Sequence, residues 1–262
     1  MVIQSLHASR LFLHILLGIF LLVATGAIWN NKTRLVKSTK RWWLGRITSL
    51  LGIEVEVKGP LPERDKNKGL LFVSNHVSWI DIPLIGGLQQ LNFLSKAEVR
   101  SWPFIGRLAE STGTLFIQRG RGDTDQIARN IASYIDEGRS VLFFPEGTTS
   151  DGRSVRRFHP KLFRAAEHTT IDLCPLAIRY HIEGHDGNPV AFIGDDEFTS
   201  HLWNLLRFRN IKATVEFLPV RPIPNESIEQ YVKAVQKEIA NTNTRWLDAS
   251  NHADQKNEVA SF

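Results

Sequence analysis

Apolar and polar residues recur with two different periods along this chain, and the two periods indicate strands and helices. Ile53–Lys58 alternates apolar and charged side chains, which is the pattern of a strand with one exposed face. Thr124–Asp136 places its three isoleucines at four-residue steps, which puts them on one stripe of a helix. Leu70–Ser74 is a short apolar run between turn residues, which is typical of a strand buried on both faces.

The same patterns predict alternating strands and helices over most of the chain. Strands are predicted at Ile53–Lys58, Leu70–Ser74, Asn92–Ser95, Thr114–Gln118, Ser140–Phe144, Leu173–Tyr180 and Ile211–Phe217. Helices are predicted at Trp79–Leu88, Phe104–Ser111, Thr124–Asp136, Lys161–His168 and Ser227–Asn241. Because strands that alternate with helices form parallel pairs, we expect an α/β fold with a mixed, largely parallel sheet flanked by helices.

The N-terminal run Leu11–Trp29 has a different character, since it is apolar apart from His14 and Thr25. At 1.5 Å per residue, a helix of this length would span about 28 Å, close to the thickness of a hydrocarbon core. We therefore expect a membrane-anchoring helix. A cleaved signal peptide is the alternative, because Ala24–Ala27 resembles a cleavage site, although the run is long for that.

Basic residues flank this run almost entirely on its C-terminal side. Only Arg10 precedes it, whereas Lys32, Arg34, Lys37, Lys40, Arg41 and Arg46 follow. Positive flanks stay in the cytoplasm, so the rest of the chain is expected at the cytoplasmic face of the inner membrane. Arg34–Gly52 mixes basic and apolar residues at helical spacing. It predicts a basic amphipathic helix that lies in an anionic bilayer interface, packs on the domain, or does both.

These patterns divide the chain into three parts. Residues 1–52 are expected to be membrane-anchoring and interfacial helices, residues 53–247 an α/β domain, and residues 248–262 a polar, frayed C-terminal tail.

Composition narrows the classes of partner. The 262 residues are 42% apolar and 23% charged, which is ordinary for a folded protein, and the net charge of +5 favours an anionic partner. Basic residues cluster beside the apolar run and no nucleic-acid-binding motif is present, so membrane lipids are expected and nucleic acid is not. The single cysteine, Cys174, excludes an internal disulfide and is interpreted as a buried, inert thiol.

Ligands of such sheets bind where strands end and loops begin, and three loops carry suggestive side chains. They are Asn75–Asp81, Arg119–Asp123 and Pro145–Arg153, each directly after an apolar strand.

The first of these loops contains a histidine followed five residues later by an aspartate. This spacing occurs twice, and the second instance, His181 and Asp186, falls in a glycine-containing stretch that we interpret as a solvated connection. His76 stands at a strand end, and Asp81 falls in the first turns of a helix that Ser78 could cap. There a carboxylate can hold one ring nitrogen while the other faces the crevice. The pattern fits a catalytic base and equally a histidine that only caps a helix.

The third loop follows the strand Val-Leu-Phe-Phe and has the composition of an anion-binding turn. Gly147 permits a tight turn, and the hydroxyls of Thr148 and Thr149 could hold an oxyanion or a phosphate. Glu146 could receive a substrate hydroxyl or anchor an arginine. Arg119, at the end of another strand, suits a phosphate, or else is a solvated surface charge.

Taken together, these loops resemble the motifs of the glycerolipid acyltransferase family, of the 1-acylglycerol-3-phosphate acyltransferase type. The four matching stretches are NHVSWID from Asn75, GTLFIQRG from Gly113, FPEGT from Phe144 and CPLAI from Cys174. The resemblance extends over roughly residues 50–220, and the first and third motifs in this order are its most specific part.

For the acyl-transfer chemistry, the resemblance implies three catalytic residues. His76 would be the general base that takes the proton of the acceptor hydroxyl, and Asp81 would orient it. Lys96 would stand near the reacting centre for oxyanion stabilisation. The acyl donor would be a thioester on coenzyme A or acyl carrier protein, acting as co-substrate, with no acyl-enzyme intermediate, no bound cofactor and no metal.

For the acceptor, the resemblance implies that Arg119 binds a phosphate and that Glu146, Gly147 and Thr148 shape the site. The expected product is phosphatidic acid, formed from 1-acylglycerol-3-phosphate. One departure affects this expectation. Members that act on this acceptor usually carry arginine after the third motif, where this chain has Thr149. Nearby arginines could replace it, namely Arg153, Arg156 or Arg157.

Two kinds of alternative stay open. The acceptor could instead be another lysophospholipid or a lyso-ornithine lipid. In another functional class, the protein could be a non-catalytic module that binds anionic lipids with its basic helix. A serine hydrolase is disfavoured, because no Gly-x-Ser-x-Gly stretch is present.

Overall fold

The computed structural model describes residues 2–63, 67–102, 105–117, 124–182, 184–185, 187–208, 210–224 and 227–259. Its centre is an eight-stranded sheet with the order β1-β7-β6-β2-β5-β3-β4, and β8 pairs beside β6. The strands are β1 (Ile53–Lys58), β2 (Leu71–Ser74), β3 (Asn92–Lys96), β4 (Leu115–Ile117), β5 (Val141–Phe143), β6 (Asp172–Ile182), β7 (Ile211–Phe217) and β8 (Arg221–Pro222).

Most neighbouring strands of this sheet are parallel. β1 is parallel to β7, β2 to both β5 and β6, and β3 to both β5 and β4. The antiparallel pairs are β6 with β7 and β6 with β8. The expectation of a mixed, largely parallel sheet is confirmed.

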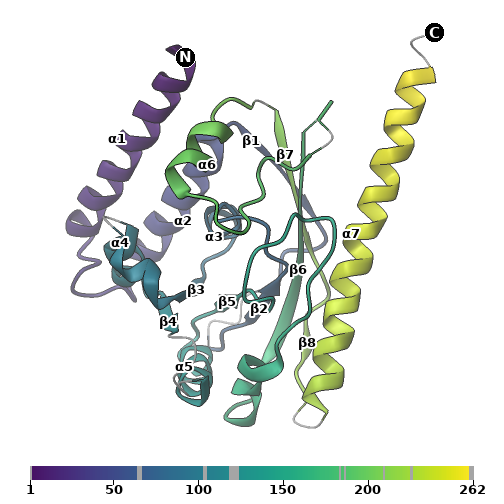
Figure 1. The fold of residues 1–262 in the computed structure, drawn as a ribbon. Coiled ribbons are helices and arrows are strands. Elements are labelled where there is room, and N and C mark those ends of the chain that lie inside the picture. The colour runs from purple at the N-terminus through teal and green to yellow at the C-terminus, as the bar shows by residue number, and fades with distance from the viewer. Residues whose placement is uncertain are drawn as a thin grey trace.

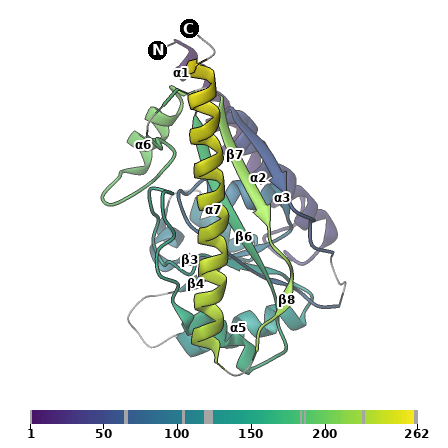
Figure 2. The ribbon, with the colours of Figure 1, turned by 90° about the vertical axis from the view of Figure 1, so that its right-hand side faces the viewer.

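Helices cover both faces of the sheet, and each face has its own apolar core. Along β2, Phe72 enters one core while Leu71 and Val73 enter the other, because successive side chains of a strand point to opposite faces. The first core is closed by α2 (Arg34–Leu50), α3 (Asp81–Leu88) and α6 (Phe198–Leu205). The second is closed by α5 (Thr124–Asp136), the 3-10 helix η2 (Pro160–Glu167) and α7 (Ile228–Val259). Figure 1 shows α1–α3 on one side of the sheet and α7 on the other, and Figure 2 shows α7 running lengthwise over the strands.

The N-terminal helix is displaced from its predicted position. α1 spans Val2–Ala24, so it begins earlier than Leu11 and ends before Trp29. It ends two residues before Gly26, whose positive φ of 71° does not continue a helix, and no glycine or proline precedes Gly18 in the chain. Among the described residues, Gln4–Ala24 is the one stretch long and apolar enough to cross a membrane, with a mean hydropathy of 2.0.

α1 is held against α2 by a reciprocal contact. The imidazole of His14 lies 2.9 Å from the carbonyl oxygen of Trp43, and the Trp43 indole N–H donates to the carbonyl oxygen of His14 at 2.9 Å. The opposite side of α1 is exposed and apolar, with Leu6, Phe12, Leu13, Leu16, Leu17, Phe20 and Val23.

α2 packs closely on α3, the helix that begins with Asp81. A Cβ built on Gly87 of α3 would lie 2.5 Å from the Cα of Gly45 in α2, so only glycine permits this approach. α2 also contributes Leu44 and Ile47 to the first core. The helix therefore supports the candidate site, although the division of the chain at residue 52 stays a prediction.

Other differences from the predicted elements are confined to short segments and to the C-terminus. The segment predicted as a helix over Lys161–His168 is the 3-10 helix η2. The helix predicted to end at Asn241 continues to Val259, so most of the expected frayed tail is helical, since no glycine or proline interrupts it. Three elements were not predicted: β8, α6 and the 3-10 helix η1 (Ala97–Ser101), which precedes α4 (Ile105–Ser111).

Candidate active site

Two of the three predicted loops leave the same edge of the sheet. β2 and β5 are parallel neighbours, so the loops that follow Ser74 and Phe143 begin side by side. The structure brings the first and third loops into direct contact there: the amide of Ser150 donates to the carbonyl oxygen of His76 at 2.8 Å.

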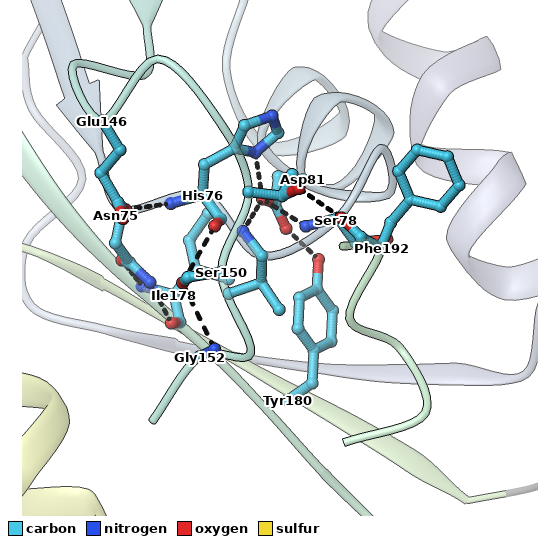
Figure 3. A network of polar contacts seen from close by, with 12 residues as sticks. Asn75, His76, Ser78, Asp81, Glu146, Ser150, Gly152, Ile178, Tyr180 and Phe192 are labelled. Carbon is cyan, nitrogen blue, oxygen red and sulfur yellow. Dashed lines mark hydrogen bonds and ion pairs between the residues drawn. The ribbon is translucent and has the colours of Figure 1, made fainter. Parts of the chain in front are cut away.

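His76 and Asp81 form the pair that their spacing suggested. The ring Nδ1 of His76 donates to Oδ2 of Asp81 at 2.7 Å. The Asp81 side chain is 0% exposed, whereas the His76 side chain is 18% exposed. In Figure 3 the other ring nitrogen, Nε2, points away from the network of contacts, and it makes no hydrogen bond within the described residues. The ring is therefore held at one nitrogen and accessible at the other.

The Asp81 carboxylate organises the whole loop. Oδ2 also accepts the amide N–H groups of Val77, at 2.7 Å, and Ser78, at 3.0 Å. Oδ1 accepts the hydroxyl of Tyr180 at 2.7 Å. Four donors therefore compensate the burial of this charge.

The prediction that Ser78 caps the helix is wrong. α3 begins at Asp81, its preceding residue makes no side-chain cap, and the buried Ser78 hydroxyl has no partner within the described part of the chain. The Asp81 carboxylate takes the nearby amide groups instead, because a charged acceptor binds them more strongly than a hydroxyl does.

Asn75 fixes the beginning of the loop to β6. Its side-chain amide donates to the carbonyl oxygen of Ile178 at 2.9 Å, and its side-chain oxygen accepts the amide of Ile178 at 2.8 Å. Since the β2–β6 ladder ends at Ser74 and Leu176, this side chain continues the pairing beyond it.

Phe144 covers one face of the His76 ring. The two rings are nearly parallel, at 7°, with centroids 3.8 Å apart. This contact excludes water from that face and leaves the edge bearing Nε2 as the accessible part.

Glu146 braces the two loops from within. It is 4% exposed, and its Oε1 accepts the amide of His76 at 2.7 Å while Oε2 accepts the amide of Arg156 at 2.9 Å. Burial raises the pKa of Glu146 to about 7, against the opposing effect of the two amide donors. Both oxygens thus contact backbone of this chain, which suits a positioning role better than the contact with a substrate hydroxyl suggested by sequence.

The remainder of the third loop turns back toward the first. Gly147 has a φ of 71°, a conformation that glycine adopts without strain, and Thr148 beside it is exposed. The hydroxyl of Thr149 donates to the carbonyl oxygen of Phe192, so it is engaged inside the protein. The arginines considered as replacements, Arg153, Arg156 and Arg157, are all exposed.

One of the two predicted cations lies within the described residues. Lys96 ends β3 and is exposed, at the same edge of the sheet as His76 but with β5 between their strands. Arg119 lies outside the described residues, two positions after the end of β4. The roles of both residues stay predictions.

The connection between β6 and β7 packs against the loop that carries His76, a contact that the sequence did not predict. The amide of Phe192 donates to the carbonyl oxygen of Val77 at 3.0 Å, and the indole of Trp79 donates to Nδ1 of His201 at 3.2 Å. The Trp79 ring also meets Phe198 edge to face. Phe198, Leu202 and Leu205 recur at four- and three-residue steps in α6, which is the signal that could have revealed this segment.

Cys174 is buried in the first core, as expected, and its burial raises the pKa of the thiol to about 12. Among the described residues, no group of three or more His, Cys, Asp or Glu side chains could hold a metal ion.

Comparison with known proteins identifies the family of this chain. The family described as acyltransferase matches residues 52–179. A lyso-ornithine lipid O-acyltransferase of Pseudomonas aeruginosa is 44% identical over 208 residues, which cover 79% of this chain and 78% of the relative. A 1-acyl-sn-glycerol-3-phosphate acyltransferase of Neisseria meningitidis is 31% identical, over 73% of this chain and 78% of the relative.

One solved structure shows the same fold. The crystal structure of the 1-acyl-sn-glycerophosphate (LPA) acyltransferase PlsC from Thermotoga maritima superposes with a TM-score of 0.65 at 19% identity, over 92% of this chain and 97% of the other.

The chain therefore belongs to the acyltransferase family, as the four motifs suggested. Within it, the relatives identify an enzyme of the type that acylates lysolipids.

Proposed function

We propose that this protein is a membrane-anchored O-acyltransferase that transfers a fatty acyl group from a thioester to the hydroxyl of a lysolipid. The observation that carries the proposal is the buried Asp81 carboxylate, 2.7 Å from Nδ1 of the partly exposed His76. A carboxylate in this position fixes the tautomer that leaves Nε2 free to accept a proton, and stabilises the imidazolium that results.

In the proposed reaction, Nε2 of His76 takes the proton of the acceptor hydroxyl as its oxygen attacks the thioester carbonyl. The tetrahedral intermediate then expels the thiolate, so a C–O bond forms and the C–S bond breaks. The imidazolium returns its proton to the thiolate. Lys96 would stabilise the oxyanion, which requires its exposed side chain to turn toward the reacting carbonyl. The donor would be acyl-coenzyme A or acyl carrier protein.

Two acceptors fit this scheme, and we propose lyso-ornithine lipid ahead of 1-acylglycerol-3-phosphate. The relative that acts on lyso-ornithine lipid is 44% identical, against 31% for the one that acts on the phosphate-bearing acceptor. Thr149 agrees with this order, because its hydroxyl is already bonded to Phe192 and is not available to a phosphate. Phosphatidic acid formation remains the second candidate, with Arg119 as its phosphate ligand.

The exposed apolar side of α1 supports a retained anchor, with the α/β domain at the cytoplasmic face. Its stripe of leucine and phenylalanine side chains is exposed in the described part of the chain, and basic residues follow it. Protease digestion of inside-out and right-side-out vesicles tests this orientation: cleavage of the domain in right-side-out vesicles would contradict it.

An acceptor screen tests the function itself. Purified protein in phospholipid vesicles would receive isotope-labelled acyl-coenzyme A or acyl carrier protein with lyso-ornithine lipid, 1-acylglycerol-3-phosphate or another lysophospholipid, and products would be read by mass spectrometry. We expect ester formation with the wild type and none with His76→Ala. Absence of product with every acceptor would favour a non-catalytic lipid-binding module, and a strong preference for 1-acylglycerol-3-phosphate would reverse the order of acceptors.

A further inference from the structure

We propose that Tyr180 is a positioning residue of this acyltransferase: acting through Asp81, its hydroxyl sets the orientation and the basicity of the His76 ring. This inference rests on the proposed role of His76 and adds a residue that lies 99 positions from Asp81 in the chain. Figure 3 shows the phenol rising from β6 to reach Asp81 on the side opposite His76.

The two oxygens of Asp81 have unequal environments, and Tyr180 accounts for the difference. Oδ2 accepts three hydrogen bonds, from the His76 ring and from the amides of Val77 and Ser78. Oδ1 accepts the Tyr180 hydroxyl alone among the described residues, at 2.7 Å. Without this donor, one oxygen of a fully buried carboxylate would have no partner, and its plane would be free to rotate away from the His76 ring.

β6 holds the loop that carries His76 at two points, and the Tyr180–Asp81 contact is one of them. Ile178 binds Asn75 through its backbone, and Tyr180, two residues later on the same face of the strand, binds Asp81 through its side chain. Asn75, which precedes His76, and Asp81, which follows it by five residues, are therefore both bonded to the same strand, β6. Tyr180 is buried, with 5% of its surface exposed, so we infer that it acts on the acceptor through Asp81.

The phenol is a permanent donor at neutral pH. Burial raises the pKa of Tyr180 well above its ordinary value, and the nearby Asp81 charge and their hydrogen bond act in the same direction. A neutral donor withdraws charge from the carboxylate, so the imidazolium of His76 is stabilised less than it would be by an unbonded carboxylate. Removing the Tyr180 hydroxyl should therefore make the His76 ring a stronger base and hold its orientation less firmly.

Three other titratable or charged groups face this loop and must be distinguished from His76. Glu146 and Arg156 lie on the side of the third loop, and His201 contacts Trp79 from α6. Within the described residues, the Tyr180 hydroxyl bonds to Asp81 and to none of these three groups, so a change confined to the phenol separates His76 from them.

Two substitutions that alter the donor in opposite directions test the proposal. Tyr180→Phe removes the hydroxyl and keeps the ring, whereas 3-fluorotyrosine at this position is a stronger donor. For Tyr180→Phe we expect kcat/KM to fall about tenfold, almost entirely through kcat, because a hydrogen bond to a charged group is lost without any contact to the acceptor. The midpoint of the acidic limb of the pH profile should move to higher pH with phenylalanine and to lower pH with fluorotyrosine.

A second readout does not need turnover. The ring protons of His76 can be titrated by NMR in detergent micelles, and their midpoint should shift in the same opposite directions. Tyr134→Phe is the matched control, because it removes a phenol hydroxyl on α5 while the ring stays available to the Arg139 guanidinium, 3.5 Å away. This control should leave rate and midpoints unchanged.

The outcomes separate this inference from the proposed function. If the wild type transfers acyl groups but both variants keep its pH profile, or shift it in the same direction, the role of Tyr180 is refuted. If the wild type acylates no lysolipid yet the His76 midpoint still moves in opposite directions, the coupling stands and the proposed function fails. A Tyr180→Phe protein that does not fold leaves fluorotyrosine and the NMR titration to decide.

Discussion

The chain contains the same His-x4-Asp spacing in two places, and within the described residues the contact between the two side chains is seen at the first of them. His76 follows a parallel strand, and its aspartate begins a helix, so the two side chains converge at 2.7 Å. His181 lies within β6, paired with Lys212 of β7, and it lines a shallow hollow of about 400 Å³ on the charged side of the sheet with Glu54 and Trp246. Asp186, its would-be partner, lies outside the described residues.

Comparing the two stretches shows which backbone structure brings two side chains five residues apart into contact. At His76 the strand ends and a helix begins within five residues, which reverses the chain and brings the carboxylate back to the ring. The strand continues past His181 to Ile182, so the backbone there runs away from the histidine. The interpretation of His181 as part of a solvated connection is wrong in this respect, since it belongs to the strand.

Replacing each histidine by alanine gives the largest contrast. His76→Ala should reduce kcat by about 1,000-fold or more, because a general base contributes roughly 10²–10⁴-fold. His181→Ala should retain nearly wild-type activity. Acyl transfer from labelled acyl-coenzyme A measures both, and equal losses in the two variants would remove the distinction drawn here.

Asp81→Asn should have the next largest effect. The amide cannot accept the His76 Nδ1 hydrogen with its nitrogen and favours the wrong tautomer, so we expect kcat to fall by about 100-fold or more. Binding of the acceptor should change little, because Asp81 is buried beneath His76. A rise in KM with unchanged kcat would assign Asp81 to acceptor binding instead.

Glu146→Gln should change how stability depends on pH. The pKa of Glu146 is raised from 4.5 to about 7 in the folded state, so the folded protein binds more protons than the unfolded chain between these values. The stability contributed by the protonated group is full below about pH 4.5 and is lost as pH rises through about 7. Relative to Glu146→Gln, the wild type should lose roughly 3 kcal/mol over this interval. Melting temperatures of the two proteins across this range check the sign.

Cys174 provides the smallest expected effect. Its buried thiol has a pKa raised to about 12, so it should not react with iodoacetamide at pH 8 unless the protein is unfolded. Cys174→Ala should retain activity. Rapid alkylation of the native protein, accompanied by inactivation, would show that the first core opens beside the site.

Sequence alone predicted the parts of the fold that repeat a period and the parts of the site that are close along the chain. β1, α5 and β7 have the predicted bounds, because each has a regular pattern of apolar residues. β8 was not predicted, because a strand of two residues is too short to show a periodic pattern. The predicted end of α7 was too early, because its apolar residues stop recurring before the helix ends.

In the site, too, contacts between residues close in sequence were predicted and contacts between distant residues were not. His76 and Asp81 are five residues apart and were paired correctly, and Cys174 was placed correctly in the core. Tyr180 was taken for part of an apolar strand, since its contact with Asp81 depends on the β2–β6 register, which no local pattern encodes. Phe144 was assigned to a strand end, since its contact with His76 depends on the pairing of β2 with β5.

The Phe144 ring, stacked on His76 with centroids 3.8 Å apart, also gives the protein an internal reporter. Protons held over the face of a benzene ring resonate upfield of their usual position, so the imidazole signals of residue 76 should stand apart from those of the other eight histidines. Any event that separates the two rings, whether lipid entering the crevice or a loop lifting, would become visible as a change in the magnetic shielding of a single side chain.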